Sequence, residues 1–144
     1  MSILKERYLL LNTIYKKKPK DQLSGLYAQL YPNSDKIIKE VTFQVTEDCC
    51  LKCSYCYQHH KTNNKMNFET AKKFIDLLLN DKISAFNLEN TAGVLFNFIG
   101  GEPLMEIDLI DKITTYIIET MANMNHPWLR FCLFSLDSNG LLYF

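Results

Sequence analysis

The sequence predicts an α/β fold with a parallel sheet, because three strand-like runs alternate with two amphipathic helical patterns. The strand-like runs are residues 41–46, 94–99 and 130–136, and one helical pattern lies in each interval between them. A strand–helix–strand order requires crossover connections, which are right-handed and make the strands parallel. Cysteines, glycines and polar residues follow the ends of these runs, at the edge where α/β folds place their sites.

Composition excludes several classes of function. The chain has 144 residues, which is the size of one domain, and its 16 basic residues balance its 16 acidic residues. This balance gives no electrostatic footprint for nucleic acid. Apolar runs fall far short of the roughly 20 residues that a membrane span needs, and Tyr8–Leu11 is too short for a signal-peptide core. We therefore expect a cytoplasmic protein with reduced cysteines, without a membrane or nucleic-acid partner.

Residues 1–40 are expected to form an N-terminal extension that carries no chemistry, ahead of a core at residues 41–144. Tyr8–Tyr15 is apolar enough for a short strand, and Lys16–Lys20 reads as an exposed break. Asp21 would cap a short helix that stops at Pro32.

The core elements follow in order. Val41–Thr46 alternates apolar and polar residues, as a strand does. Asn67 is the expected N-cap of a helix with apolar residues at helical spacing: Phe68, Ala71, Phe74, Ile75, Leu78 and Leu79. Val94–Ile99 is almost continuously apolar, which favours a strand buried on both faces. A second helix carries Ile107, Ile110, Ile113, Ile117, Ile118 and Met121, and ends near Asn125-His126-Pro127. Arg130–Leu136 is the third strand, and a turn follows at Ser138–Gly140.

Four of the five cysteines lie between Cys49 and Cys56, on the loop after the first strand. Cys49, Cys53 and Cys56 have the spacing C-x3-C-x2-C. Closed zinc sites and four-iron clusters normally take four protein ligands, so three thiolates would leave one metal position open. Cys50 also forms a regular ladder with Cys53 and Cys56, but we interpret it as a non-ligand. Cys132, in the third strand, is expected to be a small buried hydrophobe. The neighbouring His59 and His60 are interpreted as exposed loop residues.

Three motifs together resemble a known family. The loop Cys49–Cys56, with Leu51-Lys52 before its second cysteine and Tyr55 before its third, resembles the signature loop of radical S-adenosylmethionine (radical SAM) enzymes. Phe98–Leu104 resembles their GGEP motif, and Ser138–Gly140 resembles a TNG-like turn. The resemblance covers about residues 41–142. It is greatest to the peptide-maturing branch, which includes thioether-forming and sulfatase-maturating enzymes.

The resemblance implies a partial (β/α)6 TIM-like barrel, of which this chain would be the N-terminal half, truncated after the third strand. It implies that Cys49, Cys53 and Cys56 hold a [4Fe-4S] cluster by three irons, with S-adenosyl-L-methionine on the fourth. Reductive cleavage of S-adenosylmethionine would give a 5′-deoxyadenosyl radical that abstracts hydrogen from a peptide or protein substrate. A flavodoxin- or ferredoxin-like protein would donate the electron. No side chain is assigned a catalytic role beyond the cluster.

The resemblance also implies a set of cofactor-binding residues: Tyr55, Gly100, Gly101, Glu102, Ser138 and Asn139. Glu102 would accept hydrogen bonds from the cofactor's ammonium, and the two glycines would let the backbone approach the ligand. Tyr55 would line the adenine side, and Ser138 and Asn139 the methionyl or ribose part. Each has a structural alternative. Glu102 would then belong to a strand-to-helix turn with Pro103 at the helix start. Tyr55 would be a half-buried aromatic. Ser138 and Asn139 would belong to a plain Asn-Gly turn.

Two other functions compete with the enzyme. One is a non-catalytic zinc or iron–sulfur module that uses Cys49, Cys50, Cys53 and Cys56 as its four ligands. The other is an inactive fragment that lacks half of its barrel.

Overall fold

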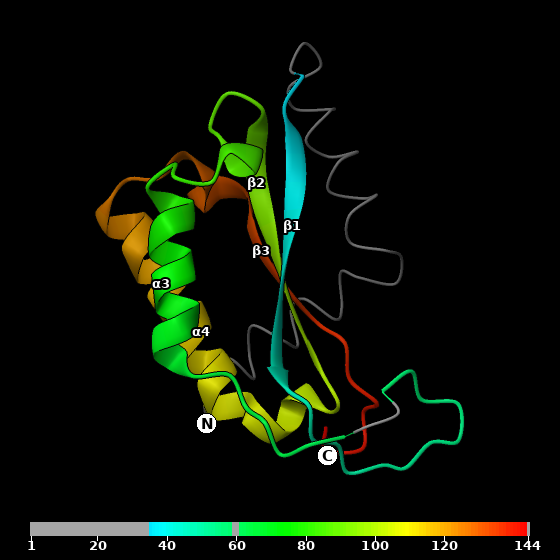
Figure 1. The fold of residues 1–144 in the computed structure, drawn as a ribbon. Coiled ribbons are helices and arrows are strands. Elements are labelled where there is room, and N and C mark those ends of the chain that lie inside the picture. Colours follow the sequence, from blue (N-terminus) through cyan, green and yellow to red (C-terminus); the bar gives the residue numbers. More distant parts are fainter. Residues whose placement is uncertain (1–34, 59–60, 144) are drawn as a thin grey trace.

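The described part of the chain forms a three-stranded parallel sheet with helices on one face (Figure 1). This computed structural model describes residues 35–58 and 61–143. The strands are β1 (Ile37–Thr46), β2 (Thr91–Gly100) and β3 (Cys132–Leu136), in the order β1-β2-β3. The helices are α3 (Phe68–Leu79) and α4 (Ile107–Asn123), with short 3-10 helices η1 (Ser84–Phe86), η2 (Pro103–Glu106) and η3 (Pro127–Phe131). The predicted parallel α/β order is thus confirmed. The predicted strand at 8–15 and the helix after Asp21 lie outside the described residues.

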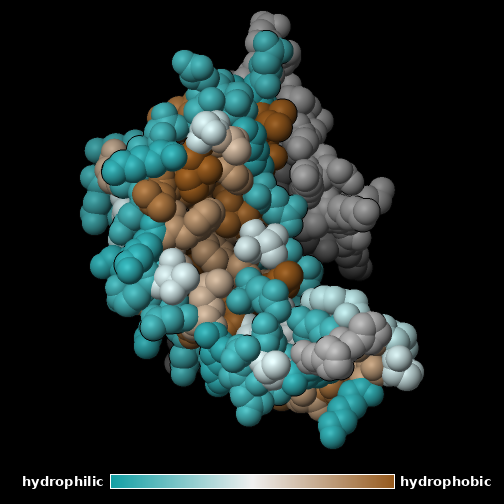
Figure 2. Space-filling view, in the orientation of Figure 1, coloured by the Kyte–Doolittle hydropathy of each residue, from teal (hydrophilic) through white to brown (hydrophobic). Residues whose placement is uncertain are grey.

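The helix-covered face of the sheet forms the main core. Phe43 stacks between Phe96 and Phe98, with ring centroids 6.2 Å and 5.7 Å away. The helices contribute the buried residues Ala71, Ile75, Leu78 and Leu79 from α3, and Ile110, Ile113, Ile117 and Met121 from α4. The helical spacing selects these residues, but of the other residues in the same predicted set Phe68, Phe74 and Ile118 are half-buried and Ile107 is exposed. Figure 2 shows that apolar surface continues between α3 and β1, along the edge of the sheet.

The central strand is buried on both faces, as its composition predicts. Val94, Phe96 and Phe98 face the helices, whereas Ala92 and Leu95 pack into a second, smaller cluster with Ile38. Ile38 belongs to an N-terminal extension of β1, which begins at Ile37 and not at residue 41. The extension forms because Ile37–Glu40 pair with Thr91–Leu95 of β2, with a register shift between Ile37 and Ile38. The alternation of apolar and polar residues in β1 alone does not reveal this pairing.

The third strand begins at Cys132, so the prediction that it starts at Arg130 is wrong by two residues. His126 caps η3 by accepting a hydrogen bond from the Trp128 N–H (3.3 Å), and Pro127 occupies the first turn. Trp128 is 1% exposed, and its indole N–H donates to the Thr91 carbonyl at 3.0 Å. Burial of this side chain holds residues up to Phe131 in a turn. No helix in the described ranges combines the length and apolarity needed to cross a bilayer.

Helix α3 begins where predicted. The Asn67 side chain accepts a hydrogen bond from the Glu69 N–H at 2.8 Å, which satisfies a free amide of the first turn. Tyr116 of α4 donates to Asp76 of α3 at 2.6 Å, and this partly buried hydrogen bond joins the two helices.

Candidate metal centre

The carboxyl ends of all three strands lie at one edge of the sheet, and the cysteine loop begins at that edge (Figure 1). The loop leaves β1 at Thr46 and returns to it, because Thr46 forms an antiparallel bridge with Lys65. The Glu47 N–H donates to the Asn64 carbonyl (3.0 Å), and the Met66 N–H donates to the Val45 carbonyl (2.9 Å). The loop is therefore closed at its base while its cysteines extend outward.

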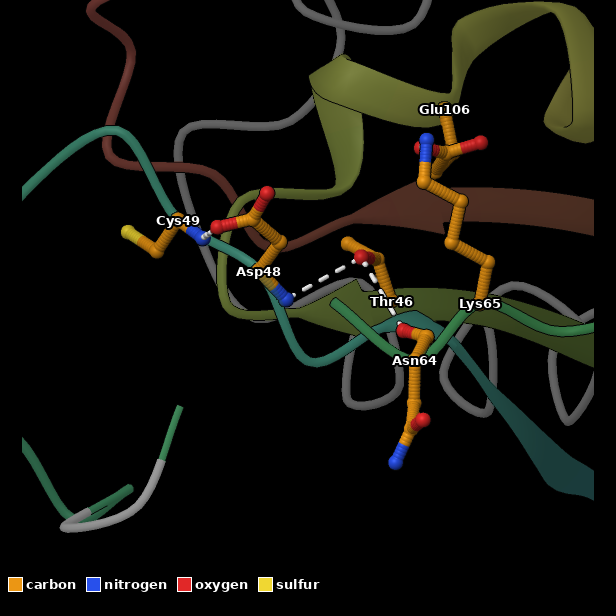
Figure 3. Close-up of polar contacts among 6 residues, drawn as sticks. All are labelled: Thr46, Asp48, Cys49, Asn64, Lys65 and Glu106. Carbon is orange, nitrogen blue, oxygen red and sulfur yellow. Dashed lines mark hydrogen bonds and ion pairs between the residues drawn. The ribbon is translucent and has the colours of Figure 1, made fainter. Parts of the chain in front are cut away.

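Asp48 orients the first cysteine. Its backbone N–H donates to Thr46 Oγ1 at 3.1 Å, and its carboxylate accepts from the Cys49 N–H at 2.7 Å (Figure 3). The Leu51 N–H donates to Cys49 Sγ at 3.4 Å. In Figure 3 the Cys49 sulfur points away from Thr46. Local backbone contacts thus present this thiol.

The other cysteines lie farther along the loop, and all are free thiols. A turn joins Cys53 and Cys56, because the Cys56 N–H donates to the Cys53 carbonyl at 3.2 Å. Among the described residues, no three His, Cys, Asp or Glu side chains gather closely enough to hold one metal ion. An iron–sulfur cluster makes a different demand, since each thiolate binds a different iron and the ligands stand apart. Cys49, Cys53 and Cys56 are free thiols on one loop, with Cys53 exposed and the other two half-buried, and they fit a cluster as a donor set.

The two glycines at the end of β2 let that strand close onto the start of the loop. A Cβ added at Gly101 would lie 2.2 Å from the Asp48 carbonyl oxygen, and one at Gly100 would lie 2.7 Å from the Thr46 carbonyl oxygen. The Gly101 N–H donates to Thr46 (3.0 Å) and the Glu102 N–H donates to Asp48 (2.8 Å). The space beside both glycines is therefore filled by the loop's own backbone.

Glu102 is fully buried and connects two of the strand ends. Its Oε1 accepts hydrogen bonds from the Leu104 N–H (2.9 Å) and from the Ser138 hydroxyl (2.8 Å). Its Oε2 accepts from the Asn139 N–H (2.9 Å). It also caps η2, with Pro103 in the first turn, which is the geometry of the turn alternative. Its predicted contact with a cofactor stays a prediction.

Asn139 lies beside the first two cysteines. Its side-chain nitrogen is 3.8 Å from Cys49 Sγ and 3.6 Å from Cys50 Sγ. The fold thus brings Glu102, Ser138, Asn139 and Cys49 into one connected group. Tyr55 is 89% exposed, so it is not the half-buried aromatic of the structural alternative. His59 and His60 lie outside the described residues.

Sequence reasoning missed the residues that brace the loop. Glu47 Oε2 accepts hydrogen bonds from the Asn64 amide (3.0 Å) and from the Thr62 hydroxyl. Lys65 forms an ion pair with Glu106 at 2.5 Å, and this hydrogen bond raises the pKa of Lys65 (Figure 3). These pairs join residues up to 41 positions apart, so no local pattern signals them. Asp48 is different, because an Asp side chain commonly bonds a backbone N–H close to it in the sequence.

A comparison with protein families supports an iron–sulfur site. The family model described as a 4Fe-4S single cluster domain matches residues 39–135, which is more than half of the chain. The chain belongs to this family. The matched region of this 4Fe-4S domain runs from β1 through the cysteine loop into β3, so it includes the sheet as well as the thiols.

One curated relative is an uncharacterized protein from Methanocaldococcus jannaschii. It is 41% identical to this 4Fe-4S domain over 88 residues. The aligned stretch covers 61% of this chain but only 28% of the relative. The chain therefore matches less than a third of the length of that protein.

Proposed function

We propose that this 4Fe-4S domain is the N-terminal part of a radical SAM enzyme. Cys49, Cys53 and Cys56 would hold a [4Fe-4S] cluster through three of its irons, with the fourth open to S-adenosyl-L-methionine. Single-cluster domains of this family occur in radical SAM-related proteins. The observation that carries the proposal is that the cysteine loop, the Gly100–Pro103 turn and the Ser138–Asn139 turn meet at one sheet edge, joined through the buried Glu102.

The residues of the site would have distinct tasks. When bound, the cluster and S-adenosylmethionine supply the radical chemistry that begins with one-electron reduction. The loop presents the thiolates, while Gly100 and Gly101 allow the end of β2 to pack against Thr46 and Asp48. Glu102 holds the third strand's turn against the loop, and Tyr55 is free to fold over a bound ligand from its exposed position.

We further propose that β1, β2 and β3 are the first three strands of a partial (β/α)6 barrel. Both helices cover one sheet face, and the opposite face is polar toward the carboxyl ends of the strands. There Asn97 accepts a hydrogen bond from Ser135 (2.7 Å) and donates to Asp137 (3.1 Å). Polar side chains near the carboxyl ends of the strands suit that end of a barrel, where α/β barrels place their sites.

The proposed substrate is a peptide or protein that undergoes maturation, and the proposed electron donor is a flavodoxin- or ferredoxin-like protein in the cytoplasm. These assignments depend on the resemblance of the Val41–His60 stretch to the peptide-maturing branch. The neutral balance of charge supports neither a nucleic-acid substrate nor a polyanion partner.

A second candidate is a non-catalytic module that holds its metal with four cysteines. One observation favours it: Cys50 lies next to Cys49 at the same amide group, 3.6 Å from the Asn139 nitrogen. Cys50 would then be a ligand, and no iron would be left open.

The test is anaerobic reconstitution with iron and sulfide, followed by low-temperature EPR of the reduced chain with and without S-adenosylmethionine. We expect a four-iron signal that changes when S-adenosylmethionine is added. Cys49→Ser, Cys53→Ser and Cys56→Ser should each lose the cluster, whereas the matched control Cys50→Ser should keep it. Loss of the cluster in Cys50→Ser, or zinc bound in place of iron, would favour the four-cysteine module. A four-iron EPR signal that stays the same when S-adenosylmethionine is added would refute cofactor binding by this chain.

A further inference from the structure

The side chain of Asn139 has a defined orientation toward the sulfur atoms of the loop. Its carboxamide oxygen accepts a hydrogen bond from the Leu141 N–H at 2.9 Å. This donor requires the oxygen on that side, so the NH2 group must face the other way. It faces Cys49 Sγ at 3.8 Å and Cys50 Sγ at 3.6 Å. An amide that points its only donors at two thiols is suited to bind a thiolate.

The backbone of Asn139 is anchored independently of its side chain. Its N–H donates to Glu102 Oε2 at 2.9 Å, and the neighbouring Ser138 hydroxyl donates to Glu102 Oε1 at 2.8 Å. Glu102 is 0% exposed, and its own N–H is bonded to Asp48 in the cysteine loop. Glu102 therefore fixes the turn after β3 relative to the start of the cysteine loop, although Asn139 and Cys49 are 90 residues apart in the sequence.

We infer that Asn139 is a positioning residue that donates an N–H···S hydrogen bond to the Cys49 thiolate and thereby raises the reduction potential of the cluster. The inference rests on the proposed ligation of a [4Fe-4S] cluster by Cys49. Reduction adds negative charge to the cluster, and part of that charge lies on the ligand sulfurs. A donor aimed at a ligand sulfur therefore stabilises the reduced form more than the oxidised form, which is one way that proteins set the potentials of such clusters.

The test is a redox titration of the reconstituted full chain, monitored by EPR, for the wild type and the variants Asn139→Leu and Asn139→Asp. Leucine has a similar size but no donor. A hydrogen bond to a charged group is worth about a tenfold change in equilibrium. We expect Asn139→Leu to lower the reduced-to-oxidised ratio at a fixed potential about tenfold, which is a midpoint about 59 mV lower for one electron. Asn139→Asp replaces the donor with an anionic oxygen and should move the midpoint further in the same direction.

Asn63→Leu is the matched control, because Asn63 is an exposed asparagine on the return side of the same loop. Its midpoint should equal that of wild type. If the leucine variant does not load a cluster, the aspartate variant decides, since it keeps the size of the side chain. The inference would be overturned if the loaded Asn139 variants kept a reduced-to-oxidised ratio, at a fixed potential, within about twofold of the wild-type ratio. A wild-type chain that takes up no four-iron cluster would instead overturn the proposed function on which the inference rests.

Discussion

Replacing Gly101 with alanine should separate the end of β2 from the cysteine loop. The added methyl carbon would lie 2.2 Å from the Asp48 carbonyl oxygen, against 3.4 Å for an ordinary contact, so the two segments must move apart by about 1.2 Å. The hydrogen bond from the Glu102 N–H to the Asp48 carbonyl is 2.8 Å long. If it takes up that movement, it lengthens to about 4 Å, which is too long for a hydrogen bond.

The expected cost follows from these two effects. Crowding a backbone segment in this way destabilises a protein by about 1–3 kcal/mol, including the roughly 1 kcal/mol of the lost hydrogen bond. Urea unfolding gives the free-energy change, and hydrogen exchange of the Glu102 amide reports the local opening. We expect a loss of stability in that range, faster exchange at Glu102 and lower cluster uptake.

Gly140→Ala is the control, because a methyl group there meets nothing within 4 Å. It should cost about 1–2 kcal/mol through its left-handed φ of +78° alone. Exchange of the Glu102 amide should stay at its wild-type rate in this control. A Gly101→Ala protein with wild-type exchange at Glu102 and a stability change below about 0.5 kcal/mol would refute the reasoning.

Three further predictions concern the rest of the core. Burial lowers the pKa of His126 below its ordinary 6.5, so the unfolded chain binds more protons at acid pH. The melting temperature should therefore fall as pH drops below 6.5, and His126→Asn, which can still cap η3, should flatten that dependence. Burial raises the pKa of Cys132 to about 12. In the native chain at neutral pH, iodoacetamide should therefore alkylate the exposed Cys50 but not Cys132, as measured by mass spectrometry. Equal labelling of the two cysteines would contradict the burial of Cys132. Trp128→Phe leaves the Thr91 carbonyl without its indole partner and should cost about 1–3 kcal/mol in urea unfolding, whereas an unchanged midpoint would show that this bond contributes nothing.

Much of the fold could be predicted from local pattern. Asn67 caps α3 as expected, and the helical spacing after it selects the buried residues Ala71 and Ile75. The boundaries were less predictable, because they depend on contacts between distant residues. Ile38 extends β1 only because β2 lies beside it, and Trp128 delays β3 only because it is buried against Thr91.

The candidate site divides in the same way. The spacing of Cys49, Cys53 and Cys56 and the Gly100-Gly101 pair are visible in the sequence, and the family match to residues 39–135 agrees with a four-iron cluster. The sequence does not reveal which atom lies beside Gly101. That atom is the carbonyl oxygen of Asp48, 53 positions earlier in the chain.

The sequence by itself therefore determined the parallel strand order, the cysteine loop and the identity of the residues at each strand end, because periodicity and spacing are local properties of a chain. The tertiary structure decided how those residues are used. Glu102 gives its oxygens to Ser138 and Asn139, and Asn139 turns its amide toward Cys49. Both outcomes depend on parallel strands that bring residues far apart in sequence to one edge of the sheet, where a buried carboxylate must find donors from whichever segments lie within reach.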